Sequence, residues 1–256
     1  MTRNKDSKSN SHRELLYGVQ PICAALRHRK RQFSELYIKG GKNNSGRIRE
    51  IQELAEELGI TVNEVPGSKL TEMCPDAVHQ GVVLRCGILP FFPISDLPLP
   101  VEGKLPLIIV LDQIEDPHNL GAVLRTCGFF DVSAVVVSKD HSCGLTPVVS
   151  KTSSGVAEWL PVISATNLTR FLQKQKSEGY WIVGLAEESN QSVSQLVRDK
   201  PLVLVLGNEG RGIRPLIRKQ CDWLVSIAGN PKVSSLNVSN AAAIALNHFY
   251  VLPEST

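Results

Sequence analysis

The sequence has no long hydrophobic run. Its longest apolar stretches, such as residues 202–206, are far shorter than the ~18 residues that a membrane-spanning helix needs, and residues 1–12 lack the apolar core of a secretory signal. Hydrophobic residues make up 42% and charged residues 21% of the chain, which argues against a disordered, collagen-like or coiled-coil protein. We expect a folded protein with no membrane partner, in the cytoplasm or, as the alternative, in an organellar matrix.

Cysteine and histidine are scarce and are not grouped. The six cysteines include no Cys-x-x-Cys pair, and the six histidines show no His-Glu-x-x-His spacing. A disulfide framework or a metal site depends on such groupings. The sequence therefore predicts reduced thiols and no metal ion.

Charge of one sign is in excess only at the start of the chain. Residues 1–87 hold 14 basic and 10 acidic residues, whereas residues 88–256 hold 14 and 15. The densest basic cluster follows a predicted helix and consists of Arg27, Arg29, Lys30 and Arg31. Two interpretations are open: these cations bind nucleic-acid phosphates, or they are a solvated helix end that complements the helix dipole.

Prolines divide the chain. Five of them fall within 17 residues, at positions 90, 93, 98, 100 and 106. Because proline has a fixed φ and no backbone N–H, this stretch can form neither a helix nor a central strand. We therefore predict a linker at residues 88–106, between one domain at residues 13–87 and another at residues 107–252.

Hydrophobic periodicity predicts an α/β fold on both sides of the linker. Before it, the pattern indicates helices at 18–28, 46–58 and 67–74 and strands at 34–39, 60–65 and 81–86. After it, the pattern indicates strands at 107–111, 134–137, 181–185, 202–206 and 223–227 and helices at 120–130, 168–178, 213–220 and 238–251. Continuous Val, Ile and Leu runs are typical of parallel sheets, which bind ligands at the carboxyl ends of their strands.

Polar segments follow three of these strands. In the first polar segment, Asn119 is positioned either to cap the following helix or to bind a ligand through its side-chain amide, and Arg125 lies six residues further on. The second, Gly-Asn-Glu-Gly-Arg-Gly at 207–212, has glycines that allow close backbone approach to a ligand, but it matches neither a Walker loop nor the dinucleotide pattern. Its Glu209 has no helix to cap and no evident ion partner, which favours ligand binding.

The third polar segment, residues 228–240, leads into an alanine-rich helix. Ser235 is the predicted N-cap of that helix, which would place Asn237 in about the first turn. An amide side chain there can bond a neighbouring loop or a ligand.

These segments carry a family resemblance. The patterns D-x-x-x-D-P-x-N-x-G-A-x-x-R, L-G-N-E-G-x-G and S-L-N-V-S resemble, in order and spacing, the three signature motifs of the SpoU/TrmH (SPOUT) family of RNA ribose 2′-O-methyltransferases. Residues 145–147 and 151–157 are similar to the family as well. The front domain, with His-Gln-Gly at 79–81, resembles the RNA-binding domain of the branch that methylates a guanosine of large-subunit rRNA.

The resemblance implies a fold and a set of ligands. The fold class is α/β, with a C-terminal trefoil-knotted SPOUT methyltransferase domain and a small N-terminal ribosomal-protein-like α/β RNA-binding domain. The implied cofactor is S-adenosyl-L-methionine, the RNA is large-subunit rRNA or its assembly intermediate, and the protein is a homodimer with its final helix in the interface. The implied cofactor-binding residues are Gly207, Asn208, Gly210, Ile227, Ala228 and Leu236.

The resemblance also implies five catalytic residues: Asn119, Arg125, Glu209, Ser235 and Asn237. The family's suggested proton acceptor is Arg125, yet a guanidinium is not deprotonated in proteins. We expect Arg125 to bind the phosphate beside the target ribose and to stabilise developing negative charge, which leaves the proton acceptor open. Pro231 stands where the family usually has glycine, so we expect a locally different path for this loop.

Two other functions are open. The first is a tRNA ribose methyltransferase of the same family, although such enzymes often carry basic terminal extensions in place of a front domain. The second is a catalytically silent RNA-binding factor in ribosome assembly, but a pure binder has no chemical need for the implied catalytic set. The sequence favours an rRNA ribose methyltransferase over both.

Overall fold

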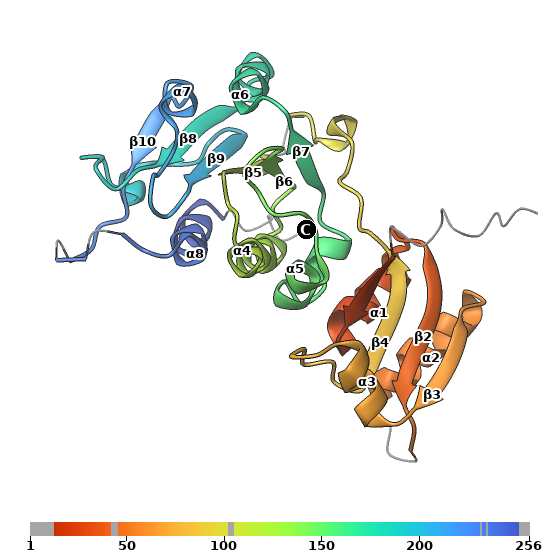
Figure 1. The fold of residues 1–256 in the computed structure, drawn as a ribbon. Helices are drawn as coiled ribbons and strands as arrows, with labels where there is room; N and C mark the ends of the chain where they lie inside the picture. The colour runs from red at the N-terminus through yellow and green to blue at the C-terminus, as the bar shows by residue number, and fades with distance from the viewer. Residues whose placement is uncertain (1–12, 42–45, 102–104, 231, 234, 251–256) are drawn as a thin grey trace, which may run out of the picture. The chain divides into compact units, whose positions relative to one another are not determined.

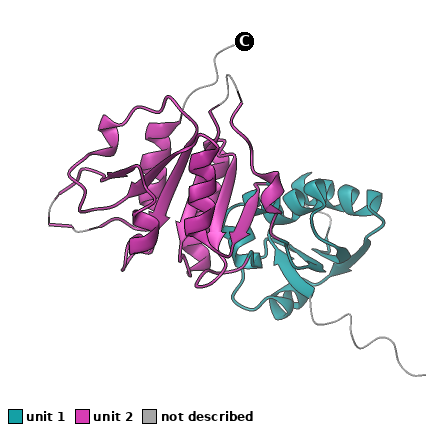
Figure 2. Cartoon of the chain, turned by 90° about the horizontal axis from the view of Figure 1, so that it is seen from above, with its two compact units in different colours: residues 1–90, 145–159 teal, residues 91–144, 160–256 magenta. Residues whose placement is uncertain are grey.

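The computed structural model describes residues 13–41, 46–101, 105–230, 232–233 and 235–250. Expectations that fall on Pro231, on residues 1–12 and on residues 251–252 therefore lie outside the described residues. The chain divides into two compact units, one of residues 1–90 with 145–159 and one of residues 91–144 with 160–256 (Figure 2). Within the described ranges, no helix is long and apolar enough to cross a membrane.

The first unit is a four-stranded sheet with helices on both faces (Figure 1). Its elements are β1 (Arg13–Tyr17), α1 (Val19–His28), β2 (Phe33–Lys39), α2 (Gly46–Glu57), β3 (Thr61–Val65), α3 (Gly67–Met73), β4 (Val82–Gly87), α5 (Pro147–Thr152) and the 3₁₀ turn η2 (Val156–Glu158). The strand order is β1-β4-β2-β3, in which only β2 and β3 are parallel. The predicted helices and strands of this domain are confirmed within one or two residues, whereas β1 and α5 were not predicted.

Alternation along the strands separates two apolar layers in this unit. Leu16, Leu36 and Leu84 point to the side covered by α1 and α2, where Ile22 and Ile51 are also buried. On the other side, α3 packs through the buried Leu70 against Val83. Burial of a leucine-sized side chain contributes about 1.5–3 kcal/mol, so this unit has a core of its own.

Arg31 is buried in the first unit. Its side chain is 0% exposed, with Nη2 2.9 Å from Glu158 Oε1 and Nη1 2.8 Å from Glu14 Oε2. Nη2 also donates to Ser150 Oγ at 3.2 Å, and Nη1 donates to the Gly87 carbonyl at 3.0 Å. One guanidinium thus joins β1, the end of β4, α5 and η2, and these contacts tie residues 145–159 to this unit.

The second unit is built on a six-stranded sheet, in the order β10-β8-β9-β5-β6-β7, whose strands are all parallel. Its elements are η1 (Ile94–Asp96), β5 (Leu107–Asp112), α4 (Pro117–Phe129), β6 (Ala134–Ser138), β7 (Val162–Ala165), α6 (Leu168–Ser177), β8 (Trp181–Leu185), η3 (Val193–Gln195), β9 (Leu202–Gly207), α7 (Pro215–Arg218), β10 (Trp223–Val225) and α8 (Val238–Phe249). The predicted parallel sheet is confirmed. The short strand β7 was not predicted.

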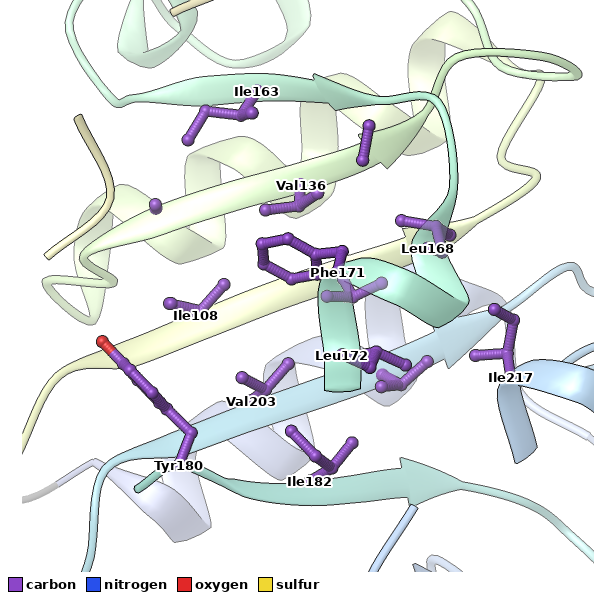
Figure 3. Close-up of a cluster of buried hydrophobic side chains, with 14 of the residues drawn as sticks. Ile108, Val136, Ile163, Leu168, Phe171, Leu172, Tyr180, Ile182, Val203 and Ile217 are labelled. Carbon is purple, nitrogen blue, oxygen red and sulfur yellow. The ribbon is translucent and has the colours of Figure 1, made fainter. Parts of the chain in front are cut away.

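Helices cover both faces of this sheet. Figure 1 shows α4 and α8 side by side on one face and α6 and α7 on the other. In Figure 3, Phe171 and Leu172 of α6 lie over Ile108, Val136 and Val203, which project from three neighbouring strands. Every residue of β5 is buried, which is why the sequence shows a continuous apolar run there.

The proline-rich stretch packs on the second unit. The Phe92 amide donates to the Val162 carbonyl at 2.8 Å, and the Tyr180 hydroxyl donates to the Pro98 carbonyl at 2.6 Å. Leu97 packs against the core of the sheet. In the division into compact units, residues 88–90 of this stretch belong to the first unit and its other described residues belong to the second.

Candidate active site

The carboxyl ends of β5 and β9 lie side by side. In the parallel register, Asp112 is opposite Gly207, although the two residues are far apart in the sequence. The first two polar segments therefore begin at neighbouring points on one edge of the sheet. This is the place at which parallel sheets bind ligands.

An ion pair fixes the segment that follows β9. Asp112 is 0% exposed. Its carboxylate accepts hydrogen bonds from Arg214 Nε at 2.8 Å and from the Arg214 backbone amide at 3.0 Å, and Arg214 Nη2 lies 2.7 Å from it. Charge and hydrogen bonds together offset the cost of burying the carboxylate. Sequence analysis did not assign this role to either residue, although an aspartate at the end of a fully buried strand indicates a polar partner.

Asn208 and Gly207 shape the turn itself. Asn208 Nδ2 donates to the Gln113 carbonyl at 3.0 Å, and Asn208 Oδ1 accepts the Gly210 amide at 2.9 Å. At Gly207, a Cβ atom would lie 2.1 Å from the Gly212 carbonyl carbon, so no larger residue fits. The close approach seen at this glycine is to the backbone of Gly212, and the approach to a ligand stays a prediction.

Residues from all three polar segments meet in one cluster, which we call the Asn–Glu–Asn cluster: Asn119, Glu209 and Asn237. Glu209 Oε1 accepts Asn119 Nδ2 at 2.8 Å and Asn237 Nδ2 at 2.6 Å. Asn237 Nδ2 also lies 2.9 Å from Asn119 Oδ1, and the Val238 amide lies 3.3 Å from Glu209 Oε1. Glu209 thus contacts the start of α8, which corrects the expectation that it has no helix to cap.

The helix caps differ from those predicted. Asp116 caps α4 by accepting the His118 amide at 2.9 Å, so Asn119 lies inside the helix and its amide is available to the cluster. Asn237, not Ser235, caps α8 by accepting the Ser239 amide at 2.9 Å. Both predicted caps were wrong because each segment offers several side chains that can cap, and the structure uses a different one.

Two of the five implied catalytic residues lie outside this cluster. Arg125 is exposed in the third turn of α4, and Ser235 is exposed before α8. Among the described residues, neither side chain has a hydrogen bond to Asn119, Glu209 or Asn237. The structure therefore brings together three of the five.

A cavity of about 800 Å³ opens beside the cluster. It is lined by the segments that follow β8, β9 and β10 and by the start of α8. All six implied cofactor-binding residues line it, and so do Glu209 and Ser235. The segments after β8, β9 and β10 thus line one pocket together with α8, whereas the first polar segment, after β5, does not contribute to its lining.

The segment after β8 is part of this pocket and was missed by the sequence analysis. It contributes Leu185, Ala186, Glu187 and Glu188. Glu188 forms an ion pair with Arg218, which also lines the pocket. The position of these residues at the carboxyl end of a predicted parallel strand was the available signal.

The basic cluster of the first unit is only partly available to a ligand. Arg27 forms an ion pair with Glu50, and Arg29 and Lys30 are exposed beyond α1. Arg31 is buried and paired with two carboxylates. The prediction that Arg31 binds RNA is therefore wrong, because its guanidinium is not at the surface.

Comparisons with known proteins agree with this geometry. The model of the SpoU rRNA methylase family matches residues 106–247, and that of the RNA 2′-O ribose methyltransferase substrate-binding domain matches residues 15–91. The chain is 39% identical to the 23S rRNA (guanosine-2′-O-)-methyltransferase RlmB of Pseudomonas aeruginosa, over 95% of this chain and 97% of that protein. The corresponding protein of Pseudomonas putida is 38% identical, over 92% and 95%.

The fold has a solved counterpart. The crystal structure of the SpoU methyltransferase AviRb from Streptomyces viridochromogenes with AdoMet aligns with a TM-score of 0.77 at 22% identity, over 96% of this chain and 92% of that one. The two family models lie on either side of the proline-rich stretch, in the order that the sequence predicts. The chain therefore belongs to the SpoU rRNA methylase family.

Proposed function

We propose that this protein transfers the methyl group of S-adenosylmethionine to the 2′-oxygen of one guanosine in large-subunit rRNA. Its family makes it an RNA ribose methyltransferase that uses this cofactor. The observation that carries the proposal is the Asn–Glu–Asn cluster beside a pocket at the carboxyl edge of the sheet. The guanosine and the 23S rRNA are supported by the RlmB relatives, which match nearly the whole chain.

The pocket fits the cofactor. A cavity of about 800 Å³ lies within the range of roughly 300–1,000 Å³ that small-molecule sites occupy. Its walls present backbone and small side chains at Gly207, Gly210 and Ala228, which suits a ligand held by main-chain groups. When bound, the cofactor supplies a methyl group on a positively charged sulfur.

The residues of the chain then have separable roles. The amides of Asn119 and Asn237 hold Glu209 and can position the target ribose. Arg125, which is exposed on α4, binds the phosphate beside that ribose and remains protonated. Ser235 lines the pocket and would contact the bound cofactor.

The other two candidate functions have less support. A tRNA enzyme has less support, because the relatives that match nearly the whole chain, front domain included, are named for 23S rRNA. A silent assembly factor would not need three polar side chains held together at the mouth of a cofactor pocket. The proposed reaction accounts for both features.

We also propose a homodimer that works in the cytoplasm without a metal ion. Large apolar side chains are exposed on the two helices that share a sheet face, with Phe129 of α4 80% and Ile244 of α8 43% exposed. A second copy would cover them. The cytoplasm is supported by the bacterial source of the RlmB relatives, and the trefoil knot stays a prediction.

Nucleoside analysis tests the reaction. The purified protein is incubated with methyl-tritiated S-adenosylmethionine and either unmodified 23S rRNA or unmodified tRNA, and the RNA is digested to nucleosides. We expect labelled 2′-O-methylguanosine from the rRNA and no label in the tRNA. Label in tRNA alone, or on a base, would contradict the proposal.

A further inference from the structure

The two oxygens of the Glu209 carboxylate have different surroundings. Oε1 accepts Asn119 Nδ2, Asn237 Nδ2 and the Val238 amide at 2.8, 2.6 and 3.3 Å. A carboxylate oxygen has about two lone pairs, so three donors occupy Oε1 fully. Among the described residues, no donor contacts Oε2. One oxygen therefore anchors the side chain, and the other is free to accept a hydrogen bond from a ligand.

No other group in the pocket is as well placed to accept a proton. The described residues that line it include no histidine, lysine, tyrosine or cysteine. Its two arginines, Arg211 and Arg218, are donors only. Of its three carboxylates, Glu188 is paired with Arg218, and Glu187 is not part of the Asn–Glu–Asn cluster.

We propose that Glu209 Oε2 accepts the proton of the 2′-hydroxyl during methyl transfer. In this step the 2′-oxygen forms a bond to the methyl carbon, and the bond from that carbon to sulfur breaks. The electron pair of the broken bond stays on sulfur, which becomes a neutral thioether. The hydroxyl proton moves to Oε2 and then to water, so atoms and charge balance. This inference rests on the proposed function.

A carboxylate is a sufficient acceptor for this reaction. As the new oxygen–carbon bond forms, the 2′-oxygen gives electron density to the methyl carbon and its proton becomes strongly acidic. No alkoxide then has to form, so in this step Arg125 binds the neighbouring phosphate and is not needed to stabilise negative charge on the 2′-oxygen. A weak base in hydrogen-bond contact can then remove it, and such positioned acceptors contribute roughly 10²–10⁴-fold to a rate. The amides of Asn119 and Asn237 hold the carboxylate in place, so no reorganisation is needed.

Binding tests the contact without turnover. The probe is a 23S rRNA fragment that contains the target guanosine, with either a 2′-hydroxyl or a 2′-fluorine on its ribose. The dissociation constant of each fragment is measured in the presence of the demethylated cofactor. Fluorine cannot donate a hydrogen bond. We expect the full-length protein to prefer the hydroxyl by about fivefold or more. Glu209→Gln should reduce this preference, because an amide nitrogen in the place of Oε2 cannot accept the hydroxyl proton.

Glu115→Gln is the matched control, since it removes an exposed carboxylate from the segment that follows β5, at a residue that is not among those described as lining the pocket. This variant should keep the preference for the hydroxyl and nearly all of the single-turnover rate. Glu209→Gln should bind the cofactor within about threefold of wild type, melt at a similar temperature and react at least ~100-fold more slowly. An unchanged preference or rate in Glu209→Gln would overturn the inference, whereas a wild-type protein that methylates no rRNA would overturn the proposed function itself.

Discussion

At the residue scale, Arg31 shows how far a local pattern can mislead. The run of cations from Arg27 to Arg31 has the composition of a phosphate-binding surface, yet Arg31 is buried against Glu158, which lies 127 residues away. Charge patterning along the chain contains no information about such a partner. The neighbouring Arg27 is exposed and paired with Glu50.

The two arginines differ in what they contribute to stability. Arg31→Ala leaves the Glu158 carboxylate buried without its partner, which should lower the free energy of unfolding by about 3–5 kcal/mol. Arg27→Ala is the control, because removal of an exposed ion pair costs about 0–1 kcal/mol. Urea denaturation of both variants measures the difference. Equal losses would show that the buried pair contributes no more than a surface pair.

Asn237 combines two roles that substitution can separate. Serine also caps helices, so Asn237→Ser should keep stability within about 0.5 kcal/mol, whereas Asn237→Ala should lose about 1 kcal/mol. Neither variant has the amide that holds Glu209, so methyl transfer should fall about 100-fold in both. Thermal unfolding and single-turnover assays measure the two effects. Full activity in Asn237→Ser would exclude a positioning role for the amide.

At the scale of elements, buried strands could be predicted well and helix starts could not. β5, which is apolar up to Asp112, and β9 are visible in the sequence because both faces of each strand are covered. By contrast, β1 carries Arg13 and Glu14, and β7 has only four residues, so neither shows a clear pattern. The start of α4 was predicted too late, although Asp116 followed by Pro117 was the available signal, since proline favours the first helical position.

The turn after β9 provides a prediction for cofactor binding. Gly207→Ala places a Cβ atom 2.1 Å from the backbone of Gly212, so the turn has to move. At Gly210 the nearest atom to a Cβ is 3.6 Å away, an ordinary contact. We expect Gly207→Ala to weaken S-adenosylmethionine binding more than about tenfold and Gly210→Ala to change it less than about twofold, because only the first shifts the pocket wall. Calorimetry measures both, and similar affinities would contradict the close approach.

At the scale of the whole molecule, the division of the chain was only partly predictable. The proline-rich stretch separates the two family domains, but residues 145–159 group with the first unit through contacts such as Arg31 with Glu158. Nothing in the periodicity of residues 145–159 could reveal this grouping, because it depends on a tertiary ion pair. That Asn119, Glu209 and Asn237 lie at one edge of the sheet could be predicted, since each follows a strand of a predicted parallel sheet. Their mutual hydrogen bonds could not be predicted, because β8 lies between β10 and β9 in the sheet.

The front domain is expected to hold the rRNA through salt-dependent phosphate contacts. Replacing Arg29 and Lys30 with glutamine should raise the RNA KM roughly tenfold. The slope of the logarithm of the RNA-binding constant against the logarithm of the salt concentration should become less steep by about one for each cation removed. Cofactor affinity should not change. The control replaces Arg47 and Arg49 of α2, which removes the same charge from the same domain. If both pairs of substitutions weaken RNA binding equally, the residues after α1 are not a specific contact.

The most direct test of the proposed function is a position-resolved map of 2′-O-methylation. Unmodified 23S rRNA is incubated with the purified protein and S-adenosylmethionine, and every ribose is then scored for methylation beside a reaction without protein. We predict one new methyl group, on a single guanosine, that is absent when Glu209→Gln replaces the wild type. No new methyl group, or methyl groups scattered over many nucleotides, would contradict a site-specific rRNA ribose methyltransferase.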